Sequence, residues 1–199
     1  ESYNQDSRKP HVELGSMEDD QKRRDFTINA MSIGLDKNNK HKLIDPFKGI
    51  EDLKKGILRT PLDPDKTYSD DPLRMIRAIR FSSQLNFKIE AKSFTSIKKN
   101  YERLKIVSNE RIIDEFNKIL LSKKPSIGLN LLFETKLLKI FFPELVKLQG
   151  KETINNHTHK DNFYHTLQVV DNISTKTQNI WLRWAALLHD IAKPQTKRY

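Results

Sequence analysis

The spacing of apolar residues changes at Pro61, and this change limits the possible folds more than any other feature of the sequence. After Pro61, apolar residues recur every three or four positions, the period of an amphipathic helix. Pro and Gly stand at several junctions between these stretches, where helices commonly end. The pattern predicts helices over residues 71–86, 90–104, 108–122, 126–140, 160–173 and 178–192.

The first 60 residues contain shorter apolar runs with the spacing of strands. The four predicted strands are 11–14, 30–35, 42–45 and 57–60. A turn at 36–39 would join the second and third strands into a β-hairpin. We expect a short helix over 47–55, closed by Gly56, and a loop over the polar residues 16–24. The predicted fold is therefore α+β and mostly α, with domains at 1–60, 61–149 and 150–199.

Composition and charge narrow the function classes. The chain has no cysteine, which excludes disulfides and thiolate metal sites and suits a cytoplasmic protein. No apolar run approaches the roughly 18 residues of a membrane span, so no membrane partner is expected. Residues 1–60 hold 12 basic and 11 acidic residues, so almost all of the net charge of +10 lies in 61–199. This excess indicates a polyanionic partner such as RNA, with lysine-rich solubilisation as the alternative.

Two segments combine charge patterns that suit phosphate or nucleotide binding. Residues 23–31 read RRDFTINAM, in which guanidinium groups can hold phosphates and an aspartate can accept from a ribose hydroxyl. Residues 70–81 read DDPLRMIRAIRF, which places Leu73, Ile76 and Ile79 on a buried stripe. Three arginines share an adjacent stripe, where without counterions they would repel one another. Bound phosphate would remove the repulsion; a charged turn and a solvated basic face are the alternatives.

Together with NERIIDEF at 109–116, SRKP at 7–10 and IDPFKG at 44–49, these segments resemble class II tRNA nucleotidyltransferases, the family of CCA-adding enzymes and bacterial poly(A) polymerases. The resemblance covers roughly residues 1–145. It implies a nucleotidyltransferase head remnant, then a helical neck and body, and a template-independent RNA nucleotidyltransferase that uses CTP or ATP on the 3′ end of tRNA or another RNA. The implied nucleotide-binding residues are Arg24, Asp25, Asn29, Asp71, Arg74, Arg77, Arg80, Glu110 and Arg111.

In that family the Asp71–Arg74 helix reads the incoming base, and Glu110 and Arg111 buttress it. The resemblance also places the family's D-x-D strand, which holds two Mg²⁺ ions, upstream of Glu1. We therefore expect an internal piece of a longer protein, with no catalytic residue among these 199 and no activity on its own. The pattern gives no sign of a protein partner.

The C-terminal helices carry a second candidate site. His165 is followed by an adjacent His189-Asp190 on another amphipathic segment, and His159 lies shortly before. Imidazoles with a carboxylate suit a divalent transition metal that activates water. The pattern resembles the start of an HD phosphohydrolase domain. A metal-dependent HD phosphohydrolase with an RNA-binding N-terminal part is thus the alternative function, and a non-catalytic RNA-binding module is a third. Structural histidines remain the other interpretation.

Overall fold

The computed structural model describes residues 15–35, 40–150, 153–154, 157–158 and 161–196. The predicted strand at 11–14 and the turn at 36–39 lie outside these residues, as does the SRKP segment. In the described part of the chain the α-helices are α1 (Met17–Arg23), α2 (Gly49–Lys55), α3 (Pro64–Asp70), α4 (Leu73–Leu85), α5 (Ala91–Asn100), α6 (Asn109–Leu120), α7 (Pro125–Glu134), α8 (Leu137–Phe141), α9 (Pro143–Val146), α10 (Asn162–Ser174), α11 (Ile180–Leu188) and α12 (Lys193–Thr196). Two 3₁₀ helices, η1 (Thr27–Asn29) and η2 (Tyr101–Ile106), complete the helical elements.

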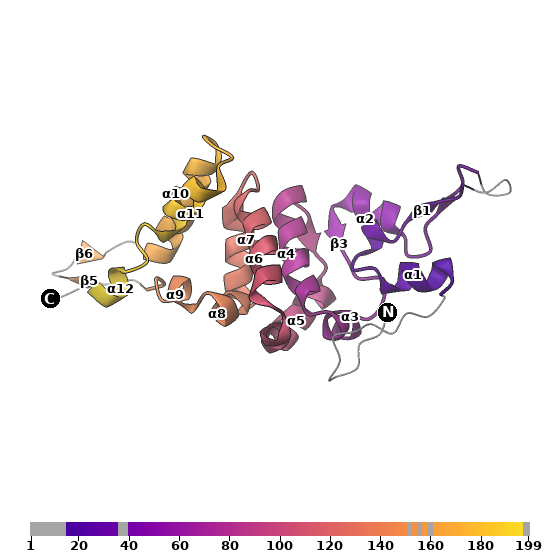
Figure 1. Ribbon diagram of the computed structural model, residues 1–199, viewed down its shortest axis with the longest axis horizontal. Coiled ribbons are helices and arrows are strands. Elements are labelled where there is room, and N and C mark those ends of the chain that lie inside the picture. Colours follow the sequence, from indigo (N-terminus) through magenta and orange to yellow (C-terminus); the bar gives the residue numbers. More distant parts are fainter. Residues whose placement is uncertain (1–14, 36–39, 151–152, 155–156, 159–160, 197–199) are drawn as a thin grey trace.

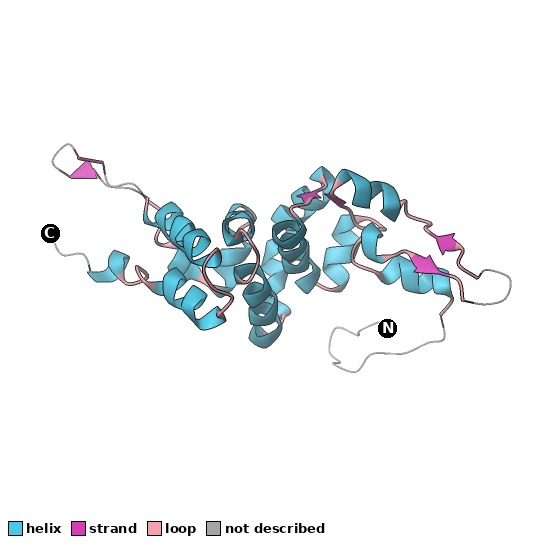
Figure 2. Ribbon diagram, turned by 90° about the horizontal axis from the view of Figure 1, so that it is seen from above, coloured by secondary structure: helices cyan, strands magenta, loops and turns pink. Residues whose placement is uncertain are grey.

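The described strands are short and form three two-stranded sheets. They are β1 (Ser32–Ile33), β2 (Leu43–Ile44), β3 (Ile57–Leu58), β4 (Lys88–Ile89), β5 (Thr153–Ile154) and β6 (His157–Thr158). β1 and β2 pair antiparallel with Ile33 opposite Leu43, which confirms the predicted hairpin. β3 pairs in parallel with β4, a partner that the sequence analysis did not predict. Figure 2 shows how little of the chain these strands occupy beside the helices. The α+β, mostly α fold class is confirmed.

The elements follow one another along the long axis of the molecule (Figure 1). The hairpin, α1 and α2 lie at one end, α3 to α9 occupy the middle, and α10 to α12 lie at the other end. None of the helices in the described part of the chain combines the length and apolar content needed to cross a membrane.

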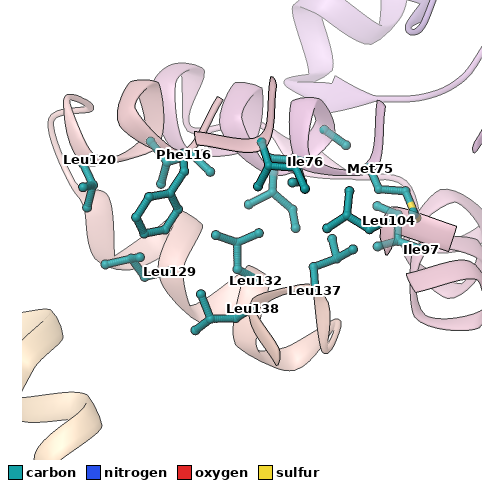
Figure 3. Close-up of a cluster of buried hydrophobic side chains, with 14 of the residues drawn as sticks. Met75, Ile76, Ile97, Leu104, Phe116, Leu120, Leu129, Leu132, Leu137 and Leu138 are labelled. Carbon is teal, nitrogen blue, oxygen red and sulfur yellow. The ribbon is translucent and has the colours of Figure 1, made fainter. Parts of the chain in front are cut away.

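The middle helices enclose a continuous apolar core. Figure 3 shows side chains from α4, α6, α7 and α8 meeting in one interior, where Ile76, Phe116, Leu132 and Leu138 have no exposed surface. Full burial of each such side chain contributes about 1.5–3 kcal/mol. The predicted stripe of Leu73, Ile76 and Ile79 is buried.

The loop predicted for 16–24 is wrong, because these residues form α1. The helix begins with a capping box in which Ser16 and Asp19 each bond the other's backbone N–H. Glu18–Lys22 and Asp20–Arg24 ion pairs at i,i+4 spacing then support it. Gln21 is its one buried residue, so α1 has no apolar stripe from which periodicity could identify it.

Three predicted helices are interrupted. The 126–140 segment divides into α7 and α8 because Lys136 adopts a left-handed conformation with φ 64°. The 90–104 segment continues from α5 into η2, and the 178–192 segment ends as α11 at Leu188. Periodicity did not predict α3, α9 and α12, which have seven, four and four residues.

Candidate functional site

Residues 23–31, called the RRD segment below, begin at the last residue of α1 and contact α4. Phe26 is buried, and its ring meets that of Phe81 on α4 edge to face at 5.7 Å. Asp25 is also buried; its Oδ1 accepts from the Phe26 backbone N–H and from Asn29 Nδ2 at 3.0 Å each. Arg24 extends along the surface and binds Asp20 at 2.7 Å. The segment thus exposes both arginines and buries the adjacent aspartate.

The IDPFKG loop packs directly on this segment. Asp45 accepts from the backbone N–H groups of Gly49 and Ile50, at 2.6 and 3.0 Å, and so caps α2. A Cβ on Gly49 would lie 2.3 Å from the Thr27 carbonyl oxygen, so only glycine allows this approach. Thr27 Oγ1 in turn donates to Asp52 on α2 at 2.8 Å. Two motifs that are distant in sequence therefore form one packed unit.

The arginines of α4 each bind a different part of the molecule. Arg74 Nη2 donates to the Arg23 carbonyl oxygen at 2.7 Å. Arg77 donates through Nε and Nη2 to Asp25 Oδ2, at 2.8 and 2.6 Å. Arg80 Nε lies 2.5 Å from Glu115 Oε2 on α6. Two of these guanidiniums have carboxylate partners within the fold, so the protein itself supplies counterions to the stripe. The repulsion argument for bound phosphate does not hold.

Asp71 connects α4 to the start of α6. Its Oδ1 accepts from the Leu73 backbone N–H at 3.2 Å, which caps α4, and its Oδ2 accepts from Arg111 Nη2 at 3.2 Å. Among the described contacts, no hydrogen bond joins the side chains of Asp71 and Arg74. Glu110, beside Arg111 in the first turn of α6, is exposed.

These contacts join most of the predicted nucleotide-binding residues into one cluster, whereas Arg24 binds Asp20 and Glu110 takes part in none of the described contacts. The start of α4 is connected to α6 by the contact between Asp71 and Arg111. It is connected to the RRD segment by Arg74, which binds the Arg23 carbonyl, and by Arg77, which binds Asp25. Each oxygen of Asp71 makes one described bond and so keeps a free lone pair, while Arg74 uses one of its five N–H donors. The cluster can therefore offer an acceptor and several donors to a flat polar ligand.

Glu115 is the residue of this cluster that sequence reasoning missed. It is buried, with a side chain 5% exposed, and it binds both Arg80 and Lys118. Its position four residues after Arg111 was the available signal, since i and i+4 share a helix face. That signal identifies the face but does not show what packs against it.

The C-terminal helices bring three of the predicted metal ligands together. Donor atoms of His165, His189 and Asp190 all lie within 4.8 Å of one another. His189 Nδ1 lies 2.8 Å from the Ala186 carbonyl oxygen, and because a carbonyl only accepts, Nδ1 carries the proton and Nε2 is free in the neutral ring. His159 lies outside the described residues.

Asp190 is held in its charged form. Partial burial acts to raise the pKa of Asp190, but the Lys193 hydrogen bond and the positive charges of His189, Lys193 and His165 outweigh it and lower the pKa. Lys193 Nζ is 2.6 Å and His189 Nε2 is 3.2 Å from the same carboxylate oxygen. With the proton on Nδ1, the Nε2 lone pair of His189 faces the Asp190 carboxylate, an arrangement that suits a shared metal cation.

Two family descriptions match the sequence. The "Poly A polymerase head domain" matches residues 1–59. The "Probable RNA and SrmB- binding site of polymerase A" matches residues 86–148.

Individual relatives agree with these families. The chain is 47% identical over 141 residues to a CCA-adding enzyme of Ligilactobacillus salivarius, which covers 70% of this chain and 34% of that protein. It is 34% identical over 188 residues to an A-adding tRNA nucleotidyltransferase of Deinococcus radiodurans, covering 91% and 42%. The fold matches the crystal structure of the Bacillus stearothermophilus CCA-adding enzyme in complex with CTP, with a TM-score of 0.71, 31% identity and coverage of 90% and 40%. The chain thus spans less than half the length of each.

Proposed function

Because this chain belongs to the family that includes poly(A) polymerases and CCA-adding tRNA nucleotidyltransferases, we propose that its protein adds nucleotides from CTP or ATP to the 3′ end of tRNA without a nucleic-acid template. The observation that carries the proposal is the cluster of Asp71, Arg111 and Arg74 anchored to the RRD segment. The relatives include CCA-adding and A-adding enzymes, so the proposal covers the class and not one product.

The polarity of the hydrogen bonds at Asp71 and Arg74 supports a choice of base. Cytosine and adenine each present an amino donor beside a ring-nitrogen acceptor, whereas uracil and guanine present a carbonyl acceptor beside a ring N–H. A carboxylate only accepts and a guanidinium only donates, so this pair matches cytosine and adenine. Against uracil or guanine it is mismatched at both contacts.

The other predicted residues divide into two roles. Arg24 is exposed and Asn29 is partly exposed, so both can approach the ribose and the phosphates of a nucleotide. Arg77 and Arg80 are engaged by Asp25 and Glu115, so they act through the placement of their neighbours. Glu110 contributes an exposed carboxylate at the start of α6, close to Arg111 in sequence.

Among the described residues, no set of ligands beside this cluster fits Mg²⁺. The one group of three close metal-ligating side chains in the described residues is the histidine cluster of the C-terminal helices. Two Mg²⁺ ions would stabilise the attacking and leaving oxygens of an in-line displacement. We assign no step of the transfer to residues of this chain. Their role is to bind and select the nucleotide.

The His165, His189 and Asp190 cluster is proposed to hold a divalent transition metal, as two imidazoles and a carboxylate prefer. Titration with Co²⁺, followed by the visible absorption of the bound ion, tests this. Replacement of His189 by Ala should abolish the signal, while replacement of the exposed Tyr164 by Ala on α10 should leave it unchanged. The comparisons favour the nucleotidyltransferase over the phosphohydrolase.

We also propose the predicted boundaries, 1–60 for the head part, 61–149 for the neck and body, and 150–199 for the start of an HD domain. Family matches that end at 59 and span 86–148 support the first two, and the α10–α11 pair with its histidine cluster supports the third. We place the protein with its tRNA substrate in the cytoplasm, which suits a chain without cysteine.

The test is incorporation of labelled nucleotide by the complete natural protein. Transfer RNA lacking its 3′-terminal nucleotides should accept CTP or ATP and reject UTP and GTP. Incorporation of all four nucleotides at similar rates, or of none, would refute the proposal. Hydrolysis of a 2′,3′-cyclic phosphate without nucleotide incorporation would support the phosphohydrolase instead.

A further inference from the structure

Arg80 and Glu115 form a buried ion pair between α4 and α6. Their side chains are 11% and 5% exposed, and Arg80 Nε lies 2.5 Å from Glu115 Oε2. An exposed pair contributes little to structure, whereas a buried pair constrains the two elements that carry it, because separation would remove the closest opposite charge from each group at a site that is poorly exposed to water. This pair therefore fixes α4 relative to α6.

Further contacts immobilise both side chains. Arg80 Nη1 donates to Gln84 Oε1 at 2.8 Å, and its guanidinium lies over the Phe81 ring at 3.8 Å from the centroid. The second oxygen of Glu115 accepts from Lys118 Nζ at 2.8 Å. Burial acts to lower the pKa of Arg80, opposed by the attraction of Glu115, and an arginine keeps its charge in any case.

On α6 the pair lies one helical turn from the contact that orients Asp71. Glu115 follows Arg111 by four residues, so both project from the same face of α6. That face makes two ion pairs, from Arg111 to Asp71 just before α4 and from Glu115 to Arg80 within α4, with opposite polarity in the two contacts. A slip of one turn between the helices would bring Glu115 toward Asp71, and their like charges would repel.

The contact at Asp71 cannot hold this geometry alone. Arg111 is 54% exposed and reaches Asp71 through one 3.2 Å bond, which water and salt can replace. We propose that Arg80 and Glu115 are positioning residues for base selection: they hold α6 so that Arg111 presents Asp71 to the incoming base. The inference rests on the proposed function.

The experiment measures selectivity separately from stability. In the complete natural protein, kcat/KM is determined for CTP and for UTP with tRNA as acceptor, and thermal unfolding is recorded in parallel. Glu115→Gln should lower the CTP-to-UTP ratio about tenfold to hundredfold, because a displaced Asp71 no longer enforces its hydrogen-bond match to the base. The double variant Arg80→Met/Glu115→Leu replaces the pair with apolar side chains, which usually preserves folding. This double variant should also lose selectivity, because an apolar contact has no preferred bond direction and so does not fix the orientation of α6 relative to α4.

Asp171→Asn is the matched control. Asp171 on α10 accepts from both the backbone N–H and Oγ of Ser126 on α7, at 2.9 and 2.6 Å, so its loss weakens another interhelical anchor. It should lower the unfolding temperature and leave the ratio unchanged. An unchanged ratio in the folded Arg80 and Glu115 variants, or an equal loss in Asp171→Asn, would overturn the inference. A wild-type protein without any preference for CTP would instead refute the proposed function.

Discussion

Removal of Arg77 should uncouple the RRD segment from α4. Arg77 makes two hydrogen bonds to Asp25 Oδ2, and the side chains are 33% and 8% exposed. Removing one partner of a buried pair costs about 3–5 kcal/mol, and an exposed pair is worth about 0–1 kcal/mol. Since Asp25 is buried and Arg77 is one-third exposed, we expect Arg77→Met to cost about 2–3 kcal/mol.

Arg74→Met is the matched control, one turn earlier on the same helix. Arg74 makes a single described bond, to the Arg23 carbonyl, worth about 1 kcal/mol. With a shift of about 2–4 °C per kcal/mol for a chain of this length, Arg77→Met should lower Tm by about 4–12 °C and Arg74→Met by at most about 4 °C.

The assay is thermal unfolding followed by circular dichroism at 222 nm, repeated for Asp25→Asn and for the Asp25→Asn/Arg77→Met double variant. The double-mutant cycle should give a coupling energy of about 2 kcal/mol. A coupling energy near zero, or equal shifts for Arg77→Met and Arg74→Met, would show that the pair does not hold the RRD segment in place.

Three other outcomes are expected. Asp71→Ala in the complete natural protein should relax selection against UTP and GTP by about tenfold to hundredfold, because each base mismatch costs about 1–3 kcal/mol; if Asp71→Ala and Arg74→Ala both keep the preference, the base-reading assignment is wrong. Gly49→Ala should destabilise the chain by about 1–3 kcal/mol in urea unfolding, because the new Cβ would overlap the Thr27 carbonyl. Gly15→Ala is the control and should be neutral, because a Cβ there meets no atom closer than 3.6 Å. RNA should bind mainly through residues 61–199, with log Kd changing by about 0.7 per log salt for each phosphate contacted, and an affinity independent of salt would contradict this.

Much of the helical body could be predicted from the sequence because α4, α6 and α10 carry apolar stripes that pack against the core. Prediction failed where other forces determine the structure. α1 is stabilised by its capping box and surface ion pairs, and the break before α8 depends on the left-handed Lys136. Neither feature alters apolar periodicity, so periodicity could not reveal them.

The candidate site was predictable as a set of segments and not as a set of contacts. Asp25 and Arg77 are 52 residues apart, and Asp71 and Arg111 are 40 apart, so their pairing depends on how the head packs on α4 and α6 on α4. The family resemblance brought the right segments together. It gave no indication that Glu115, outside the predicted set, holds Arg80.

The arginine stripe of α4 shows why the contacts, and not only the segments, matter for function. A row of like charges calls for anionic partners, and from sequence alone these could be a ligand's phosphates or the protein's own carboxylates. In the described structure Arg77 and Arg80 find carboxylates, while Arg74 binds only a backbone carbonyl, which leaves its charge uncompensated. A ligand therefore gains most from Arg74, which lies beside Asp71 at the start of the helix. The internal pairs thus leave Arg74 as the arginine of the three that is free for the base selection proposed above.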